Sequence, residues 1–318
     1  MKKLILGAMV LLFAFSAMAL DYPKSAVTII CPWAPGGGTD RMARFIAEEL
    51  QKVYKVPFNV VNRTGGNGVT GHSAIASARP NGYTLGAVTH DITTLKWMGL
   101  TELTPDDFSY VGQVIVQYPA LIVRNDSPYK TVKDLIDDIK KRPGELTLVG
   151  TAVAGAYDLM RLGVMKSQGL KPDDIKFIPS TGAAAAIVEL MGGHCDFTSV
   201  APGEAIGQIQ SGDFRGLGIS APKRLAAFPD IPTLEEQGID YIMASWAGIG
   251  GPKGIPQEIL DDLTEKISVI MKSDACKDFM EKNGTTPGEL LGEAYYKQAV
   301  QDAVDCRDIM EYAGYLKK

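Results

Sequence analysis

The stretch Ala26-Val27-Thr28-Ile29-Ile30-Cys31-Pro32-Trp33-Ala34-Pro35-Gly36-Gly37-Gly38-Thr39-Asp40 determines how the first part of the chain folds. Its first six residues form an apolar run that is typical of a strand buried on both faces, and Pro32 ends that run. After the glycines, apolar residues recur at helical spacing from Met42 to Val53. We therefore expect a buried strand, a glycine loop and then a helix.

The same kind of unit recurs along the chain. Further strands are expected at Phe58–Val61, Tyr83–Val88, Phe108–Val116, Ala120–Val123, Leu146–Val149, Ile175–Ile178, Phe197–Val200 and Leu217–Ile219. Between Asp106 and Arg124 the chain is extended with no helical pattern, and this stretch is the candidate crossing into a second domain. The extended segment Tyr241–Trp246 offers the return crossing, and the chain after Pro256 has the periodicity of helices.

This pattern predicts an α/β fold of two lobes. Lobe 1 would comprise residues 20–123 together with 242–318, and lobe 2 would comprise residues 124–241. Two parallel or mixed sheets would be joined by two crossing strands, with the ligand in the cleft between the lobes. The length of 318 residues agrees with two domains.

The composition excludes several classes of function. Hydrophobic residues make up 46% of the chain and charged residues 22%, as in an ordinary globular protein. The 32 Lys and Arg residues are scattered among 37 Asp and Glu, so we expect no nucleic-acid partner. The three histidines are not spaced as metal ligands, and the sequence has no Gly-x-Ser-x-Gly elbow of a hydrolase. We expect a monomer without metal, cofactor or catalytic activity.

The first residues have the three-part pattern of an export signal. Lys2 and Lys3 precede the apolar run Leu4–Phe15, and the small residues of Ala17-Met18-Ala19 follow. We predict that residues 1–19 are a signal peptide, that cleavage follows Ala19, and that the mature protein is periplasmic. A retained membrane anchor is the weaker alternative, because the apolar run is shorter than the roughly 20 residues that a span needs.

Glycine-bearing loops at strand ends suggest a site for anions. The loops Pro35–Thr39, Gly65–Gly68 and Ala154–Ala156 each precede a helical pattern. Backbone N–H groups at a helix start point toward a ligand, and the helix dipole favours negative charge there. A tight turn needed only for packing is the alternative for any one of these loops. No Gly-Lys-Ser or Gly-Lys-Thr ends them, which disfavours a nucleotide phosphate site.

A set of motifs in fixed order resembles one protein family. The set comprises Pro32–Asp40, Asn62-Arg63, Pro80–Leu85, Thr181-Gly182-Ala183, Leu190–His194, Ala221–Arg224, Phe228–Thr233 and Trp246-Ala247-Gly248. In this order the motifs resemble the extracytoplasmic receptors of tripartite tricarboxylate transporters, the TctC or Bug family. The resemblance implies a type II-like periplasmic binding protein that closes on a small organic acid. It also implies delivery of that acid to the membrane permease subunits of such a transporter.

The loops and the resemblance together give the expected ligand contacts. Trp33 and Trp246 are expected at the mouth of the cleft by resemblance. The full set is Trp33, Ala34, Pro35, Gly36, Gly37, Gly38, Thr39, Gly66, Gly68, His90, Thr151, Gly155, Ala156, Tyr157, Asp158, Thr181, Gly182, Ala183, Ala201 and Trp246. The loops Pro35–Thr39, Gly65–Gly68 and Thr181–Ala183 contain no Lys or Arg, so backbone N–H groups, hydroxyls and helix dipoles would meet the negative charge.

The second lobe departs from the family pattern. Where related sequences carry a run of Ser and Gly leading to a His, this chain has Thr151-Ala152-Val153-Ala154-Gly155-Ala156-Tyr157-Asp158. Asp158 is either a first-turn acid that stabilises its helix or a group that faces the cleft. In the second case the ligand would carry a donor or a cationic group opposite its carboxylate.

Three further questions stay open at the level of sequence. A binding protein that reports to a two-component sensor is an alternative to transport, and a secreted hydrolase is a remote one. Cys31 and Cys195 are expected to be inert core thiols. Cys276 and Cys306 lie in two helical segments near the C-terminus, and they are the pair that a disulfide could join.

Overall fold

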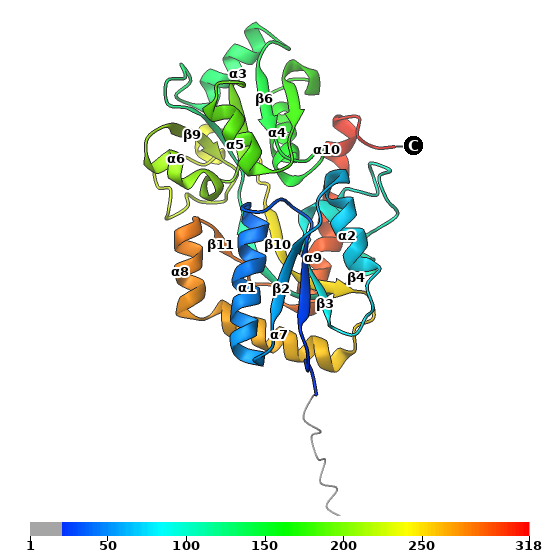
Figure 1. Ribbon diagram of the computed structural model, residues 1–318. Coiled ribbons are helices and arrows are strands. Elements are labelled where there is room, and N and C mark those ends of the chain that lie inside the picture. Colours follow the sequence, from blue (N-terminus) through cyan, green and yellow to red (C-terminus); the bar gives the residue numbers. More distant parts are fainter. Residues whose placement is uncertain (1–20, 318) are drawn as a thin grey trace, which may run out of the picture.

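The computed structural model describes residues 21–317, which form two lobes, each built on one mixed sheet (Figure 1). In the first lobe these residues form six strands in the order β11-β4-β10-β3-β1-β2, and in the second they form five in the order β7-β6-β8-β5-β9. The two-lobed α/β prediction is thus confirmed. The predicted signal peptide, residues 1–19, lies outside the described residues.

The first lobe starts as the sequence predicts. Strand β1 (Val27–Cys31) lies between β2 and β3, parallel to both, so its apolar side chains are buried on the two faces of the sheet. The other elements of this lobe are α1 (Gly38–Tyr54), β2 (Phe58–Asn62), α2 (Val69–Ala76), β3 (Thr84–Thr89), β4 (Phe108–Gln117), β10 (Ser245–Pro252), α7 (Gln257–Met271), α8 (Asp274–Asn283), β11 (Thr286–Pro287) and α9 (Gly292–Asp305).

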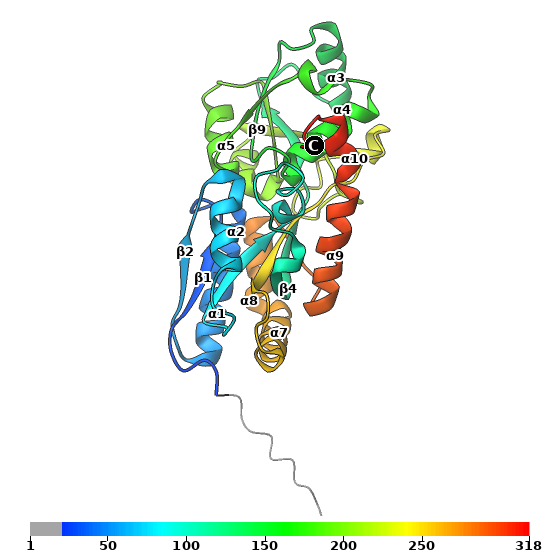
Figure 2. The same cartoon turned by 90° about the vertical axis from the view of Figure 1, so that its right-hand side faces the viewer.

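Helices cover both faces of this first sheet. Met42 and Ile46 of α1 share a buried core with Leu263 of α7, while Ile75 of α2 and Tyr295 of α9 belong to the core on the other face. Helices α1 and α7 therefore cover one face and α2 and α9 the other, and all four can be followed in Figure 2. Burial of these apolar side chains is the main force that holds the layers together.

The second lobe repeats the design on a smaller sheet. Most of α4 packs with α3 on one face, and α5 packs on the other. Helix α3 begins with a reciprocal cap, because the Thr131 side chain accepts from the Asp134 N–H while the Asp134 carboxylate accepts from the Thr131 N–H. The elements are β5 (Ala120–Arg124), α3 (Val132–Lys141), β6 (Thr147–Gly150), α4 (Ala156–Ser167), β7 (Lys176–Pro179), α5 (Ala183–Met191), β8 (Phe197–Val200), α6 (Ile206–Gln210) and β9 (Phe214–Ile219).

The structure corrects where the chain first crosses between the sheets. Strand β5 pairs with β8 and β9 of the second sheet, although the sequence prediction assigned residues up to 123 to lobe 1. The crossing therefore lies between β4 and β5, at Tyr118 and Pro119. A continuous apolar pattern on both sides of Pro119 hides this change of sheet, because both strands are buried in their own cores. The return crossing precedes β10.

The C-terminal segment makes a third connection between the lobes. Helix α10 (Arg307–Tyr312) follows α9 and packs on α4 of the second lobe (Figure 2). Ile309 and Met310 share a buried core with Leu159 and Leu162 of α4. The sequence prediction instead returned all C-terminal helices to the first lobe. Within residues 21–317, no helix is long and apolar enough to cross a membrane.

Candidate functional site: a cleft pocket at three helix starts

A pocket lies between the two lobes, where the starts of three helices meet. Its lining includes Gly38 and Thr39 at the start of α1, Ala156 and Tyr157 at the start of α4, and residues 183–185 at the start of α5. All three helices follow the carboxyl end of a strand, which is where open α/β sheets place ligands. The pocket therefore gathers backbone N–H groups from both lobes.

These helix starts make the pocket favourable for negative charge. The first N–H groups of a helix have no partner within the helix, and the helix dipole adds positive potential beside them. None of the three starts has a capping side chain on its own N-cap residue, which is glycine in each case: Gly37, Gly155 and Gly182. The N-cap residues themselves therefore occupy none of these donors. Thr39, Thr151 and Thr181 add hydroxyls to the same wall.

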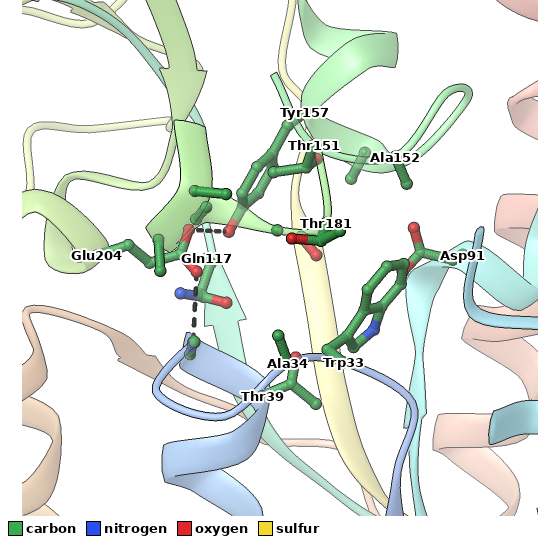
Figure 3. Close-up of a pocket in the computed structure, with 18 of the residues that line it drawn as sticks. Trp33, Ala34, Thr39, Asp91, Gln117, Thr151, Ala152, Tyr157, Thr181 and Glu204 are labelled. Carbon is green, nitrogen blue, oxygen red and sulfur yellow. Dashed lines mark hydrogen bonds between the residues drawn. The ribbon is translucent and has the colours of Figure 1, made fainter. Parts of the chain in front are cut away.

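One carboxylate of the second lobe reaches the first helix. Glu204 follows β8, and its Oε1 accepts a hydrogen bond of 3.3 Å from the backbone N–H of Gly38, the first residue of α1. Its Oε2 accepts from the Tyr157 hydroxyl at 2.8 Å and from the Ala201 N–H at 3.4 Å (Figure 3). Burial raises the pKa of Glu204, although these donors oppose that shift.

A second carboxylate belongs to the first lobe. Asp91 follows β3, and its Oδ2 accepts from the Thr89 hydroxyl at 2.9 Å. Thr89 Oγ1 also lies 3.4 Å from the indole N–H of Trp33 and 3.3 Å from His72 Nε2. Burial lowers the pKa of His72, so its ring is neutral near pH 7. This small network fixes Asp91 beside Trp33 at the edge of the pocket (Figure 3).

The pocket lining has no basic side chain among the described residues. Its charged members are Asp91 and Glu204, and its other polar side chains include those of Gln117 and Ser245. Among residues 21–317, no group of three or more His, Cys, Asp or Glu side chains is arranged to hold a metal ion. The chemistry of the lining is therefore that of hydrogen bonding and helix dipoles.

The structure brings together most of the residues predicted from the loops. Those that line the pocket are Trp33, Ala34, Pro35, Gly37, Gly38, Thr39, Thr151, Ala156, Tyr157, Thr181, Gly182 and Ala183. Sequence reasoning missed Asp91, Gln117, Ala152, Ala184, Ala185, Glu204 and Ser245, which also line it. A signal for three of these was present, because Asp91, Gln117 and Glu204 each lie at or just after the carboxyl end of a strand.

Other predicted residues support the pocket without lining it. Gly36 and Gly155 flank it in the loops before α1 and α4, and the N–H of Ala201 bonds to Glu204. Gly66 and Gly68 belong to a loop with a different role. Its Asn67 donates a hydrogen bond of 2.8 Å to the Val153 carbonyl, which links the two lobes. Gly68 contributes close packing, because a Cβ there would lie 3.1 Å from the Trp33 ring.

Asp158 does not face the cleft. Its Oδ1 accepts from Arg161 Nη2 at 2.6 Å, and its Oδ2 accepts from the Ala154 N–H at 2.9 Å and from the Tyr315 hydroxyl at 3.0 Å. Both partners of the ion pair are buried. Asp158 is thus a structural acid in the first turn of α4, held by an arginine one turn later.

His90 and Trp246 do not line this pocket, although both were expected among the ligand contacts and Trp246 was expected at the mouth of the cleft. Both are buried and line a separate cavity, whose other walls come from residues 241–244 and from the end of α9. The Trp246 indole N–H donates to Asp302 Oδ2 at 2.6 Å. Because β10 lies in the interior of the sheet between β3 and β4, Trp246 packs against Tyr295 in the core and not in the ligand pocket.

The structure also contradicts the possible disulfide. Cys276 and Cys306 are both free, as are Cys31 and Cys195, and all four are buried. Cys276 packs in the core beneath α1 and α7, whereas Cys306 belongs to the core between α10 and α4. Two cysteines in separate cores cannot approach to the distance that a disulfide requires. The packing of α8 and α9 against different elements was not visible in the sequence.

Comparison with known proteins assigns the family. Residues 42–311 match the family model described as "Tripartite tricarboxylate transporter family receptor". Protein BugT of Bordetella pertussis is 30% identical over 277 residues, which are 84% of this chain and 82% of that protein. The matched region covers most of both lobes, including all of α4 and α5 and the part of α1 from Met42 onward.

Two solved structures extend the match to the fold. The periplasmic binding protein BugD is 26% identical and superimposes with a TM-score of 0.85, over 93% of this chain and 100% of that one. An R. palustris protein solved with adipate is 26% identical, with a TM-score of 0.87 over 92% of this chain and 99% of that one. The resemblance seen in the ordered motifs is confirmed. The chain therefore belongs to the tripartite tricarboxylate transporter receptor family, a family of binding proteins and not of enzymes.

Proposed function

We propose that the protein captures a small organic carboxylate in the cleft between its lobes and presents it to the membrane subunits of a tripartite tricarboxylate-type transporter. The convergence of three helix starts on one pocket is the observation that carries this proposal. The R. palustris relative solved with adipate supports a carboxylate as the ligand class. The periplasm is the proposed site of action, reached through a signal peptide that is cleaved after Ala19.

Backbone donors are sufficient to hold such a ligand. A hydrogen bond to a charged group is worth roughly 1.5 to 3 kcal/mol, so two or three of them outweigh the desolvation of one carboxylate. Neutral donors also suit a transport receptor, because they bind the acid without a buried ion pair that would slow its release. Gly38 shows the geometry, since its N–H already binds the carboxylate of Glu204.

Closure of the lobes would complete the site. The pocket takes its walls from both lobes, so a ligand that contacts both has higher affinity for the closed form. Contacts across the cleft are present in the structure, from Glu204 to Gly38 and from Asn67 to Val153. A closed shape is also the feature that a membrane partner can distinguish from an open one.

Thermal melting tests the ligand class. Each carboxylic acid in a panel of mono-, di- and tricarboxylates is compared with its carboxamide, which keeps the shape and removes the charge. An acid at 100 times its Kd should stabilise the fold by about 2.7 kcal/mol, or about 5 °C in melting temperature. The amide should give no shift. Equal shifts by acid and amide, or shifts by sugars alone, would show that the pocket is not a carboxylate site.

A further inference from the structure

We propose that Asp91 is a specificity-determining residue and that the ligand carries a protonated amine as well as its carboxylate. The ligand would then be an amino acid or a similar zwitterion, with its ammonium group against Asp91. This inference deepens the proposed function and rests on it, because the carboxylate of the same ligand is assigned to the helix starts.

The first observation is a buried carboxylate with no positive partner. The Asp91 side chain lines the pocket, and the residue is only 9% exposed. Within the part of the chain that the structure describes, no Lys, Arg or His nitrogen makes an ion pair with it. An uncompensated charge in such surroundings costs free energy, which a cationic group of a ligand would recover.

The second observation is a free acceptor on the pocket side. Oδ2 of Asp91 is bonded to the Thr89 hydroxyl, and among the described residues no donor is bonded to Oδ1. The neighbouring loop before α4 does not supply a donor either, because none of its described N–H groups bonds to Oδ1. Oδ1 lies close to Gly155 in this loop, and a Cβ at that position would be only 2.8 Å from it. Gly155 thus gives Oδ1 room.

The other groups near Asp91 leave its charge unmatched. The Thr89 hydroxyl has one proton, and it is given to Oδ2. His72 donates from Nδ1 to the Gly68 carbonyl, which leaves Nε2 to accept from the Thr89 backbone N–H at 3.4 Å. Trp33 contributes its indole N–H to Thr89 and not to Asp91. The network orients the carboxylate but brings no cation to it.

Glu204 provides the contrast within the same pocket. Its two oxygens accept from the Gly38 N–H, the Tyr157 hydroxyl and the Ala201 N–H, so its charge already has donors on both sides. In Figure 3, Glu204 and Asp91 lie at opposite sides of the pocket, with Gln117 and Thr181 between them. A ligand that lies between the two carboxylates can therefore present a different group to each of them. At the Asp91 end, Oδ1 is left without a donor among the described residues.

The experiment measures a ratio of affinities on the intact mature protein. Isothermal titration compares succinate with aspartate, glutarate with glutamate, and adipate with 2-aminoadipate, all in the presence of a chelator to exclude metal bridges. Within each pair the carbon skeleton is the same and only the amine differs. The aminated member of the best-binding pair should bind at least about tenfold more tightly, as expected for a charge-assisted hydrogen bond. Acetylation of that amine should abolish the gain.

Two variants assign the preference to one residue. Asp91→Asn keeps the size of the side chain and removes its charge, so the ratio should fall to near one. Glu204→Gln removes a charge from the same pocket at a position whose oxygens already have donors. It is expected to change both affinities in parallel and to keep the ratio. The ligand pairs test the wild-type protein by themselves if Asp91→Asn does not fold.

The outcomes separate this inference from the proposed function. If carboxylates bind but the amine gives no gain, or if the plain diacids bind better, the inference is wrong and the carboxylate site stands. An equal fall in the ratio for Glu204→Gln and Asp91→Asn would overturn the assignment to Asp91. If none of the acids binds with or without an amine, the proposed function itself fails.

Discussion

At the scale of single residues, Glu204 connects the two lobes through one side chain. It extends from the second lobe and accepts a hydrogen bond from the first N–H of α1 in the first lobe. In this position its carboxylate occupies a donor that an anionic ligand would also use. Burial raises the pKa of Glu204 above its usual value, so the ionised form is disfavoured in the folded protein relative to the unfolded chain.

The pH dependence of stability follows from that shift. For a carboxyl group with a raised folded pKa, its contribution is fully present below the unfolded pKa and is lost as pH rises through the folded pKa. The Glu204→Gln variant has no such ionisation. The melting temperature of the variant minus that of the wild type should therefore increase as pH rises from about 4 to 7. A gap that narrows over this range would mean that Gly38 and Tyr157 stabilise the ionised form by more than burial disfavours it.

The cysteines give a chemical prediction at the same scale. Burial raises the pKa of Cys31 to about 11 and that of Cys306 to about 12, and it also raises the pKa of Cys195 and Cys276. A thiol reacts as the thiolate, so the native protein should resist iodoacetamide at pH 8. After unfolding without reductant, all 4 cysteines should be alkylated. If mass spectrometry finds Cys276 and Cys306 unalkylated and linked to each other, the two residues form a disulfide and the present account of the thiols is wrong.

Sequence could locate the pocket better than it could orient individual side chains. Thr39 and Thr181 were found because each lies in a glycine-bearing loop that precedes a helix. Asp158 and Asp91 show what the sequence could not predict. Both lie near a helix start, so the sequence alone does not tell which of them faces the pocket. Only the structure shows that Arg161 pairs with Asp158 in the interior, whereas no cation within residues 21–317 pairs with Asp91. The direction of a carboxylate depends on partners that are distant in the sequence.

At the scale of elements, the start of α5 depends on one glycine. Gly182 is the N-cap of this helix and has φ +148°, a conformation that residues with a side chain rarely adopt. No atom lies within 4 Å of a Cβ built there, so a substitution would act through the backbone and not through a clash. The first N–H groups of α5 would then turn away from the pocket.

Gly182→Ala should therefore weaken carboxylate binding by about tenfold, which corresponds to the loss of one hydrogen bond to a charged group. Gly207→Ala is the matched control, because this glycine in α6 also has open space around a Cβ but lacks the positive φ. The control should bind normally and be as stable as the wild type or slightly more stable. Titration calorimetry measures both. Equal affinities for the two variants would remove α5 from the site.

Strand β10 shows why some elements escape prediction. Its sequence, Ser245–Pro252, contains three glycines and ends in proline, a composition that indicates a loop. The glycines allow close packing between β3 and β4: a Cβ at Gly248 would lie 2.3 Å from the Gly112 carbonyl oxygen, and one at Gly250 would lie 2.6 Å from that of Ser109. The bounds of the apolar strands were predicted to within a few residues, because their runs of apolar side chains are the ones that become buried. Strand β10 instead forms because its glycines fit closely against the neighbouring strands, which its own sequence does not reveal.

At the scale of the whole molecule, three connections join the lobes. Two are the chain crossings, near Pro119 and before Ser245, and the third is the packing of α10 on α4. Tyr312 strengthens the third by donating its hydroxyl to the Leu170 carbonyl at 2.6 Å. The contacts at Glu204 and Asn67 are single hydrogen bonds, so the lobes can rotate about these connections while those contacts open.

Small-angle scattering tests this motion. Without ligand, the contacts from Glu204 to Gly38 and from Asn67 to Val153 should open in part of the population. A saturating carboxylate should then reduce the radius of gyration and bring the profile to that calculated from the present structure. The carboxamide of the same acid should leave the profile as it is. An identical profile with and without the acid would show that the lobes are held rigidly by α10.

A crystal structure of the protein with its best-binding carboxylate would locate the ligand. We predict the carboxylate within hydrogen-bond distance of the first backbone N–H groups of α1 or α5, with both lobes in contact with the ligand. The alternative cavity beside Trp246 should remain without that ligand. A carboxylate found there, or one whose oxygens face solvent away from all three helix starts, would contradict the proposed site.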